Sequence, residues 1–202
     1  MSLRLVHLID DDWEVREALG FLLRTVGLDV RGYQDALAFL DALPGLPPGC
    51  IVTDIRMPRL TGLKLQERLA ASRCRWPVIV ITGHGDVEAC RVAFRNGAAD
   101  FLTKPIDEQV LIDTVQAALA RLEAMLAAEA DASSARQRLE RLSEREREIL
   151  ALIAEGHSSK EAARRLGISP RTVDTHRAHL AEKLETSSLA EMVRLHLQGA
   201  DR

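Results

Sequence analysis

The stretch Leu5-Val6-His7-Leu8-Ile9-Asp10-Asp11-Asp12 joins a short apolar run to three carboxylates, and similar junctions recur in the first half of the chain. Ile51 to Thr53 leads into Asp54, Val78 to Ile81 into Thr82, and Phe101 to Thr103 into Lys104. If these runs are parallel strands, the side chains that follow them meet outside the carboxyl ends of one sheet, where open α/β sheets bind ligands. The sequence therefore predicts a pocket with several carboxylates, one hydroxyl and one ammonium.

Apolar runs alternate with amphipathic stretches from Leu3 to about Leu122, a pattern typical of βα units. A further short strand is expected at Asp29 to Tyr33. Helices are expected at Trp13–Val26, Ala36–Ala42, Leu63–Ala71, Val87–Asn96 and from about Asp107. Five βα units in this order predict a doubly wound, five-stranded parallel sheet of the flavodoxin-like strand order.

A stretch without proline or glycine follows, from Leu111 to about Leu142, and its composition favours a helical connector. Asp131, Ser133 and Ser134 are its weakest helical positions, so a break would fall there. A disordered alanine-rich linker stays open as the alternative, because isolated helices of this kind are only marginally stable in water.

The last segment reads as four short helices. Ser143 with Glu146 three residues later is a capping-box start, and Gly156 ends that helix. The others are expected at Ser159–Leu166, Pro170–Leu184 and Leu189–Leu197. A helix, a glycine-containing turn and a polar-faced helix form the helix-turn-helix pattern. The predicted domains are residues 1–122, a helical linker at 123–139, and an all-α domain at 140–202.

The 202 residues are enough for two domains. Apolar runs stay far below the roughly 20 residues that cross a bilayer, and the start does not have the pattern of a signal peptide, so we expect a soluble, cytoplasmic protein without a membrane partner. Cys50, Cys74 and Cys90 do not form a Cys-x-x-Cys pair and are expected to be buried thiols.

Charge is distributed unevenly along the chain. Residues 1–135 carry 14 Lys/Arg against 19 Asp/Glu, a balance of −5, and residues 136–202 carry 13 against 11, a balance of +2. A sensor joined to a nucleic-acid module is compatible with this asymmetry, although many neutral proteins divide as unevenly.

The expected pocket brings Asp10, Asp11 and Asp54 together, and like charges at short range repel unless they are compensated. Mg²⁺ resolves that conflict, because it takes carboxylate and phosphate oxygens and keeps several waters. Asp54 could then receive a phosphoryl group, with Lys104 as a second positive partner and the Thr82 hydroxyl as a donor to a phosphoryl oxygen. Taken alone, the aspartate triplet is more typical of a solvated helix start; the joint pattern with Asp54, Thr82 and Lys104 makes it specific.

With these motifs the chain resembles a two-domain response regulator of the FixJ/NarL class, a CheY-like receiver followed by a LuxR-type helix-turn-helix. The matching receiver strings are Leu-Ile-Asp10-Asp11-Asp12, Thr-Asp54-Ile-Arg-Met-Pro58, Ile-Thr82-Gly-His-Gly-Asp86, Asn-Gly-Ala-Ala-Asp-Phe101 and Leu-Thr-Lys104-Pro105. The resemblance implies phosphorylation of Asp54 by a cognate sensor histidine kinase.

The same resemblance implies further roles around Asp54. Mg²⁺ would be held by Asp10, Asp11, Asp54 and the main-chain carbonyl of Arg56. Thr82 and Phe101 would form the switch pair, Lys104 would contact the phosphoryl group, and Pro105 would follow a cis bond. Apart from the resemblance, His84 could act as a catalytic acid or base, but its glycine-flanked loop favours a conformational or gating role.

The LuxR-type resemblance covers about Leu142 to Gln198. Independently of it, helical spacing predicts that Val173, Leu180 and Leu184 are buried and that the opposite face points outward, where Thr172 and His179 are expected to contact DNA. Phosphate partners are expected at Lys160, Arg171, Arg177 and Lys183, and base contacts at Asp174, Thr175 and Ala178. His176 is expected to be packed or phosphate-facing rather than a metal ligand, since no second ligand has a suitable spacing.

The sequence thus predicts a transcriptional regulator in which phosphorylation of Asp54 creates a homodimer that binds double-stranded DNA and acts on RNA polymerase. A net charge of +2 is modest for DNA binding, which favours a dimer on paired half-sites. One alternative is a phosphohydrolase with an aspartyl-phosphate intermediate, but Arg56 stands where those enzymes have a second acid. Another is a regulator that acts by protein contact without binding DNA.

Overall fold

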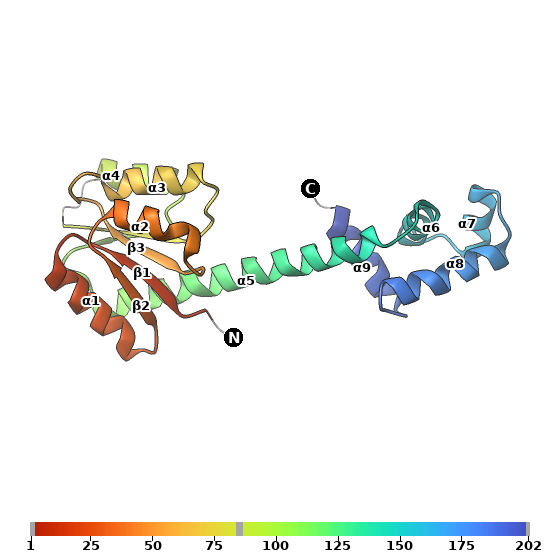
Figure 1. The fold of residues 1–202 in the computed structure, drawn as a ribbon, viewed down its shortest axis with the longest axis horizontal. Helices are drawn as coiled ribbons and strands as arrows, with labels where there is room; N and C mark the ends of the chain where they lie inside the picture. Colours follow the sequence, from red (N-terminus) through yellow and green to blue (C-terminus); the bar gives the residue numbers. More distant parts are fainter. Residues whose placement is uncertain (1–2, 84–86, 201–202) are drawn as a thin grey trace. The chain divides into compact units, whose positions relative to one another are not determined.

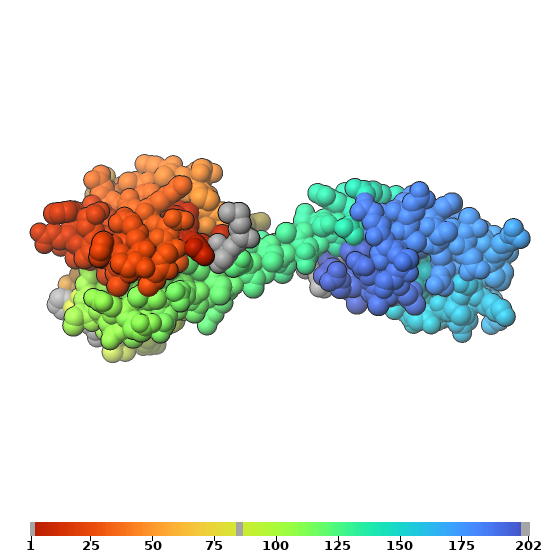
Figure 2. Space-filling view, turned by 90° about the horizontal axis from the view of Figure 1, so that it is seen from below, coloured from red at the N-terminus to blue at the C-terminus, as the bar shows by residue number. Residues whose placement is uncertain are grey.

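The computed structural model describes residues 3–83 and 87–200. The chain divides into two compact units, Met1–Met125 and Leu126–Arg202. In the space-filling view the red-to-green atoms of the first unit and the teal-to-blue atoms of the second are each closely packed (Figure 2). Among the helices of the described residues, none combines the length and apolar character needed to cross a bilayer.

A five-stranded parallel sheet forms the centre of the first unit (Figure 1). Its strands are β1 (Leu5–Ile9), β2 (Asp29–Tyr33), β3 (Cys50–Asp54), β4 (Val78–Thr82) and β5 (Asp100–Thr103). The order β2-β1-β3-β4-β5 confirms the predicted flavodoxin-like arrangement. Register pairs Ile9 with Thr53 and Thr82 with Thr103, so the carboxyl ends of these strands lie along one edge.

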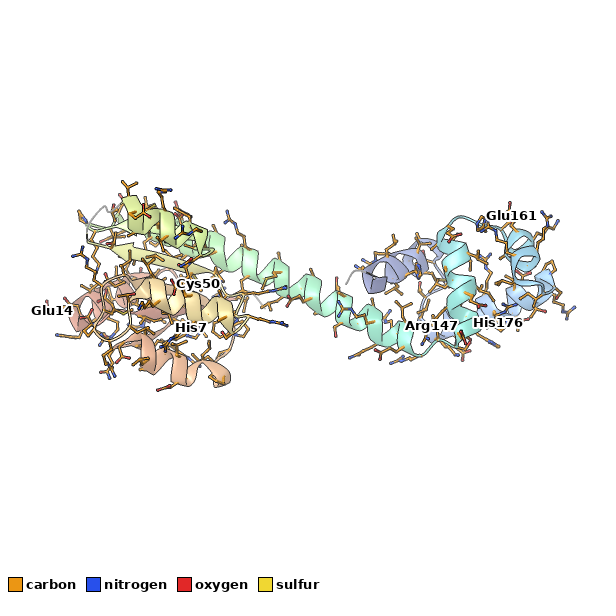
Figure 3. All side chains as sticks on the ribbon, turned by 90° about the horizontal axis from the view of Figure 1, so that it is seen from above. His7, Glu14, Cys50, Arg147, Glu161 and His176 are labelled. Carbon is orange, nitrogen blue, oxygen red and sulfur yellow. The ribbon has the colours of Figure 1, made fainter. Side chains whose placement is uncertain are left out.

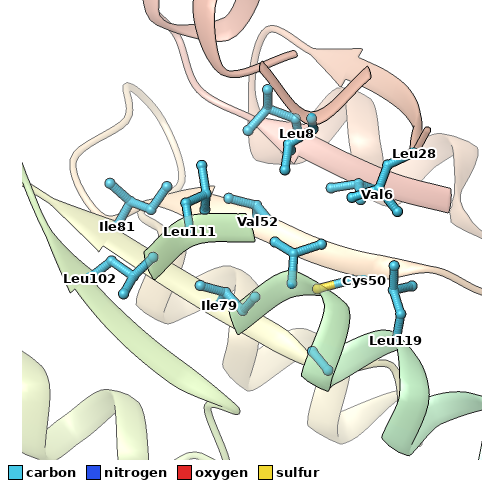
Figure 4. Packing of buried hydrophobic residues seen from close by; sticks show 13 residues of the cluster. Val6, Leu8, Leu28, Cys50, Val52, Ile79, Ile81, Leu102, Leu111 and Leu119 are labelled. Carbon is cyan, nitrogen blue, oxygen red and sulfur yellow. The ribbon is translucent and has the colours of Figure 1, made fainter. Parts of the chain in front are cut away.

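Helices cover both faces of this sheet. They are α1 (Trp13–Thr25), α2 (Ala36–Ala42) with the 3₁₀ turn η1 (Leu43–Gly45), α3 (Gly62–Ala71), α4 (Val87–Arg95) and α5 (Glu108–Glu140). One core cluster packs α1 and α5 against the strands, with Leu111 of α5 beside Val52 and Leu119 beside Cys50 (Figure 4). A second cluster packs α2, α3 and α4 on the other face, around the fully buried Phe39.

The long helix α5 runs without a break from Glu108 to Glu140, so the chain is helical through the predicted weak positions. Asp131, Ser133 and Ser134 are all exposed, and their side chains therefore stay hydrated within the helix. Ala135, in contrast, is fully buried in the core of the second unit, and Leu139 packs against the same core. The last turns of α5 thus contribute to the second core.

The second unit adds α6 (Glu144–Ala154), α7 (Ser159–Leu166), α8 (Pro170–Lys183) and α9 (Leu189–Ala200). The predicted capping box is present: Ser143 caps α6 and receives the Glu146 side chain in return. Ser158 and Glu161 repeat the motif on α7. Gly167, with a φ of 67°, ends α7 and lets the chain turn into α8. This is the four-helix, helix-turn-helix arrangement expected from the sequence.

Candidate phosphoryl site and nucleic-acid interface

Two buried carboxylates meet at the carboxyl edge of the sheet. Asp10 follows β1 and Asp54 ends β3, and only 3% and 7% of their surfaces are exposed. Lys104, which follows β5, bridges them: its Nζ lies 2.8 Å from Asp54 Oδ1 and 3.2 Å from Asp10 Oδ2. Three strand ends that are distant in sequence thus bring opposite charges together, as the apolar-to-polar junctions predicted.

Burial is the largest single influence on the pKa values of Asp10 and Lys104. Loss of water raises the pKa of Asp10, an effect opposed by hydrogen bonding from the Asp12 N–H and by the charge of Lys104. Burial alone would lower the pKa of Lys104, but its contacts with Asp54 and Asp10 outweigh that effect and raise it. Lys104 is therefore a firmly protonated cation that compensates part of the carboxylate charge.

The donors in the pocket fit a hard divalent cation. Asp54 uses Oδ1 for Lys104, and its Oδ2 accepts the Arg56 N–H at 2.5 Å. Asp11 is exposed beside the buried Asp10. The two buried carboxylates face one ammonium, and the ligand atoms that they offer are oxygens, the chemistry that Mg²⁺ prefers. A second cation is the natural compensation for this excess of negative charge.

The loop between β3 and α3 is tightly turned beneath Asp54. The N–H of Gly62 donates to the Ile55 carbonyl at 3.0 Å, and a Cβ on Gly62 would lie 2.3 Å from the Asp54 carbonyl oxygen. Only glycine fits there. The contact between Gly62 and Ile55 therefore fixes the two ends of the loop that follows Asp54.

The remaining receiver residues named from the sequence lie nearby on the sheet. Thr82 is buried at the end of β4, and Phe101 is half-buried on β5, packed against the cluster that includes α3 and α4. The Lys104–Pro105 bond is cis. His84 lies outside the described residues.

Two arginine contacts near the pocket had no signal in the sequence. Arg16 of α1 donates from Nη1 to the main-chain oxygen of Asp10 at 2.7 Å. Arg59 of the β3–α3 loop forms an ion pair with Asp35, the N-cap of α2. Arg59 and Asp35 are 24 residues apart, and Arg16 reaches the Asp10 main chain from the first turn of α1, so neither contact follows from a helical or strand period.

In the second unit, α7, the turn and α8 form a helix-turn-helix whose buried side is as predicted. Val173, Leu180 and Leu184 are fully buried, and α8 leaves its other side to solvent. The exposed residues of this side and of α7 that were named as DNA contacts are Lys160, Arg171, Thr172, Asp174, Thr175, Ala178 and His179. The start of α8 is capped by Ser169, whose hydroxyl accepts the Thr172 N–H at 3.1 Å.

Two of the expected phosphate partners are engaged within the protein. Lys183 donates from Nζ to Glu146 Oε2 at 2.7 Å, and Glu146 is only 3% exposed. Burial would raise the pKa of Glu146, but Lys183 and Ser143 hold it down to about 2. Arg177 donates from Nη1 to Ser159 Oγ at 3.1 Å. These contacts give Lys183 and Arg177 structural partners on α6 and α7, which sequence spacing could not reveal.

His176 is half-buried on α8, on the side that faces α6 (Figure 3). Within the described residues its Nδ1 has no hydrogen-bond partner. The fold brings ligand atoms of Glu146, His176 and His179 within 4.8 Å of one another, which their spacing in the sequence does not indicate. Glu146, however, is already held by the Lys183 ammonium.

Both units match known families. Residues 6–116 match "Response regulator receiver domain", and residues 140–196 match "Bacterial regulatory proteins, luxR family". The chain belongs to the two-component response regulators that join a receiver to a luxR-type DNA-binding domain.

Within that class the chain is similar to FixJ. It is 47% identical to the transcriptional regulatory protein FixJ of Azorhizobium caulinodans over 95% of this chain and 91% of that protein. Identity to FixJ of Bradyrhizobium diazoefficiens is 42% over 96% and 95% of the two chains. Among solved structures, the response regulator StyR aligns with a TM-score of 0.85 at 37% identity, covering 95% and 96% of the two chains. These relatives are regulators and not enzymes, so the phosphohydrolase alternative is unsupported.

Proposed function

We propose that this protein is a phosphorylation-controlled transcription factor in which Asp54 accepts a phosphoryl group from a cognate sensor histidine kinase. The observation that carries the proposal is the buried Asp10–Lys104–Asp54 cluster at the carboxyl edge of the receiver sheet. The family supports a kinase partner and DNA binding. The residue roles, the dimer and the contact with RNA polymerase in the cytoplasm are parts of the proposal.

In the proposed transfer, a carboxylate oxygen of Asp54 attacks the phosphorus of a phosphohistidine, the P–N bond breaks, and an acyl phosphate forms. Asp10, Asp11, Asp54 and the Arg56 carbonyl would hold Mg²⁺, which neutralises charge on the phosphoryl oxygens. Lys104, already 2.8 Å from Asp54, provides a fixed positive charge beside the new phosphoryl group. Thr82 and Phe101 would rearrange in response.

A surface suited to a docking helix lies beside this pocket. Trp13 and Phe21 on α1 are 63% and 69% exposed, which is unusual for aromatic side chains. A separate open hollow of about 290 Å³ is lined by α1 and the start of α5, including Leu19, Leu22 and Pro105. We assign the approach of the kinase to this side because it adjoins Lys104.

The output step that we propose is dimerisation through α4, β5 and α5. Val87 and Phe94 of α4 and Val110 of α5 are 74%, 49% and 48% exposed, so this face presents apolar surface that a second copy could cover. Dimerisation would pair two α8 helices on two DNA half-sites. A charge change at Asp54 would bias this face between two arrangements.

Intact-mass measurement with a small phosphodonor and Mg²⁺ tests the acceptor. The wild-type chain should gain one phosphoryl group and Asp54→Asn none, while Asp11→Asn should gain it only at higher Mg²⁺. Phosphorylation that survives Asp54→Asn would sink the assignment. Enrichment of genomic DNA fragments on the full chain tests DNA binding, and no enrichment with or without phosphodonor would favour the protein-contact alternative.

A further inference from the structure

The β3–α3 loop contains a strained residue at its centre. Arg59 has a φ of 67°, a region that L side chains rarely adopt. The Leu60 N–H donates to the Pro58 carbonyl at 2.7 Å, so Arg59 is the middle residue of a γ-turn with positive φ, which is the rare and strained form. Such strain persists only where surrounding contacts impose it.

Asp35 supplies that contact from a different loop. One of its oxygens, Oδ1, caps α2 by accepting the N–H groups of Leu37 and Ala38, both at 2.9 Å. The other oxygen, Oδ2, pairs with the Arg59 guanidinium. Asp35 is also buried, with 5% exposure. Its position is therefore fixed both by burial and by the hydrogen bonds to the helix that it caps. Its charge thus anchors Arg59 to a rigid part of the receiver.

The anchored loop is the one that carries the residues around Asp54. Arg56 N–H holds Asp54 Oδ2, and Gly62 closes the loop back onto Ile55. Because both ends of the loop are fixed, its remaining freedom lies in the segment from Arg56 to Thr61. Arg59 ties the middle of that segment to α2.

We propose that the Arg59–Asp35 pair is a positioning latch that holds the β3–α3 loop in the conformation that binds Mg²⁺. The inference rests on the proposed function of the pocket and assigns it two residues that contact neither the cation nor the phosphoryl group. Removing the latch lets the strained turn relax and moves the Arg56 main chain, so the cation site must be reorganised when Mg²⁺ binds. The affinity for Mg²⁺ falls because part of the binding free energy is spent on that reorganisation.

The test measures Mg²⁺ binding to the full chain by calorimetry in a double-mutant cycle. Arg59→Gln removes the charge but keeps the positive-φ residue, and Asp35→Asn removes the charge but retains a good helix cap. Each should weaken Mg²⁺ binding by about two- to fivefold, the range expected for a partly exposed ion pair. The double variant should be no weaker than either single variant, because both remove one interaction.

Arg73→Gln is the matched control, since Arg73 also has a positive φ, 58°, but lies beyond the far end of α3. It should bind Mg²⁺ as the wild type does. The latch is refuted if Arg59→Gln binds like Arg73→Gln, or if the two single effects add. A wild-type chain that binds Mg²⁺ no better than Asp54→Asn overturns the proposed pocket, and the latch with it.

Discussion

At the residue scale, the pocket depends on a shared counter-ion. Lys104 contacts Asp10 and Asp54 at once, so one ammonium compensates two buried carboxylates that would otherwise repel. Arg16 and Arg59 hold the loops that carry those carboxylates without reaching the carboxylates themselves. The Lys104 ion pairs and the loop contacts of the two arginines together fix the position of Asp54.

His7 supplies a residue-scale prediction about pH. The ring is fully buried on β1, stacks on Trp76, and lies 3.1 Å from the Pro47 carbonyl and 3.2 Å from the Tyr33 hydroxyl. Because a carbonyl only accepts, Nε2 donates to Pro47, and in the neutral ring Nδ1 then accepts from the Tyr33 hydroxyl. Burial lowers the pKa of His7 below 6.5.

Below pH 6.5 the unfolded chain therefore binds a proton at His7 that the folded chain does not. The stability that neutral His7 supports is complete above pH 6.5 and declines as pH falls from there toward the lowered pKa, by up to about 1.4 kcal/mol per pH unit. In urea unfolding, His7→Gln should show a flatter pH dependence than wild type, with the other five histidines common to both. Parallel curves would contradict this.

Residue patterns predicted the members of this pocket but not its anchors. Apolar runs that end on Asp10, Asp54, Thr82 and Lys104 carry a signal because strand ends of a parallel sheet converge. The Arg59–Asp35 pair carries none, since Arg59 reads as an ordinary loop residue and Asp35 as a helix cap. Contacts between loops depend on backbone angles that composition and periodicity do not specify.

At the element scale, α6 and α8 are joined by one buried carboxylate. Glu146 caps α6 through Ser143 and pairs with Lys183 of α8. Its pKa of about 2 lies well below the ordinary 4.5, so ionised Glu146 stabilises the fold above pH 4.5, and this stabilisation is lost as pH falls toward 2. The helix-turn-helix is thus fastened at its base by a charge.

Glu146→Gln should lower the free energy of unfolding of the second unit by roughly 2–3 kcal/mol at pH 7, because the amide keeps a cap but loses the charge. Glu161→Gln is the matched control, since Glu161 forms the same capping box with Ser158 but is exposed. The free energy of unfolding should fall less in Glu161→Gln than in Glu146→Gln. Equal losses in thermal unfolding would show that the burial of Glu146 has no energetic role.

Salt dependence separates the two kinds of basic residue on α8. Arg171 is exposed, whereas the Lys183 ammonium is held by Glu146. Arg171→Ala should reduce the slope of log affinity against log salt by about one, the value for one phosphate contact. Lys183→Met should leave the slope unchanged and lower stability instead. A reduced slope for Lys183→Met would restore it as a phosphate partner, as the sequence first predicted.

At the scale of the whole molecule, the two cores do not divide where the sequence suggests a linker. The family match to the DNA-binding domain begins at residue 140, but the buried Ala135 and the packed Leu139 lie before it. Arg138 also donates from Nη1 to the Leu184 carbonyl at 3.3 Å. A uniform helical pattern hides this boundary, because Ala135 looks the same in a core as in a connector.

A fragment of residues 126–202 should therefore be more stable than one of residues 140–202, by about 1–3 kcal/mol for the apolar surface restored. In the full chain, Ala135→Glu should destabilise the second unit, and Ser134→Glu at the neighbouring exposed position should not. Unfolding followed by circular dichroism measures both. Fragments of equal stability would assign residues 126–139 to a true linker.

DNA affinity before and after phosphorylation tests the central claim most directly. A DNA fragment enriched by the full chain is titrated with wild type and Asp54→Asn, each with and without phosphodonor and Mg²⁺. We predict that phosphodonor tightens binding by wild type by about tenfold, a usual size for coupling between sites, and leaves Asp54→Asn unchanged. Equal affinities for wild type in both conditions, or the same gain in Asp54→Asn, would contradict control of DNA binding by Asp54.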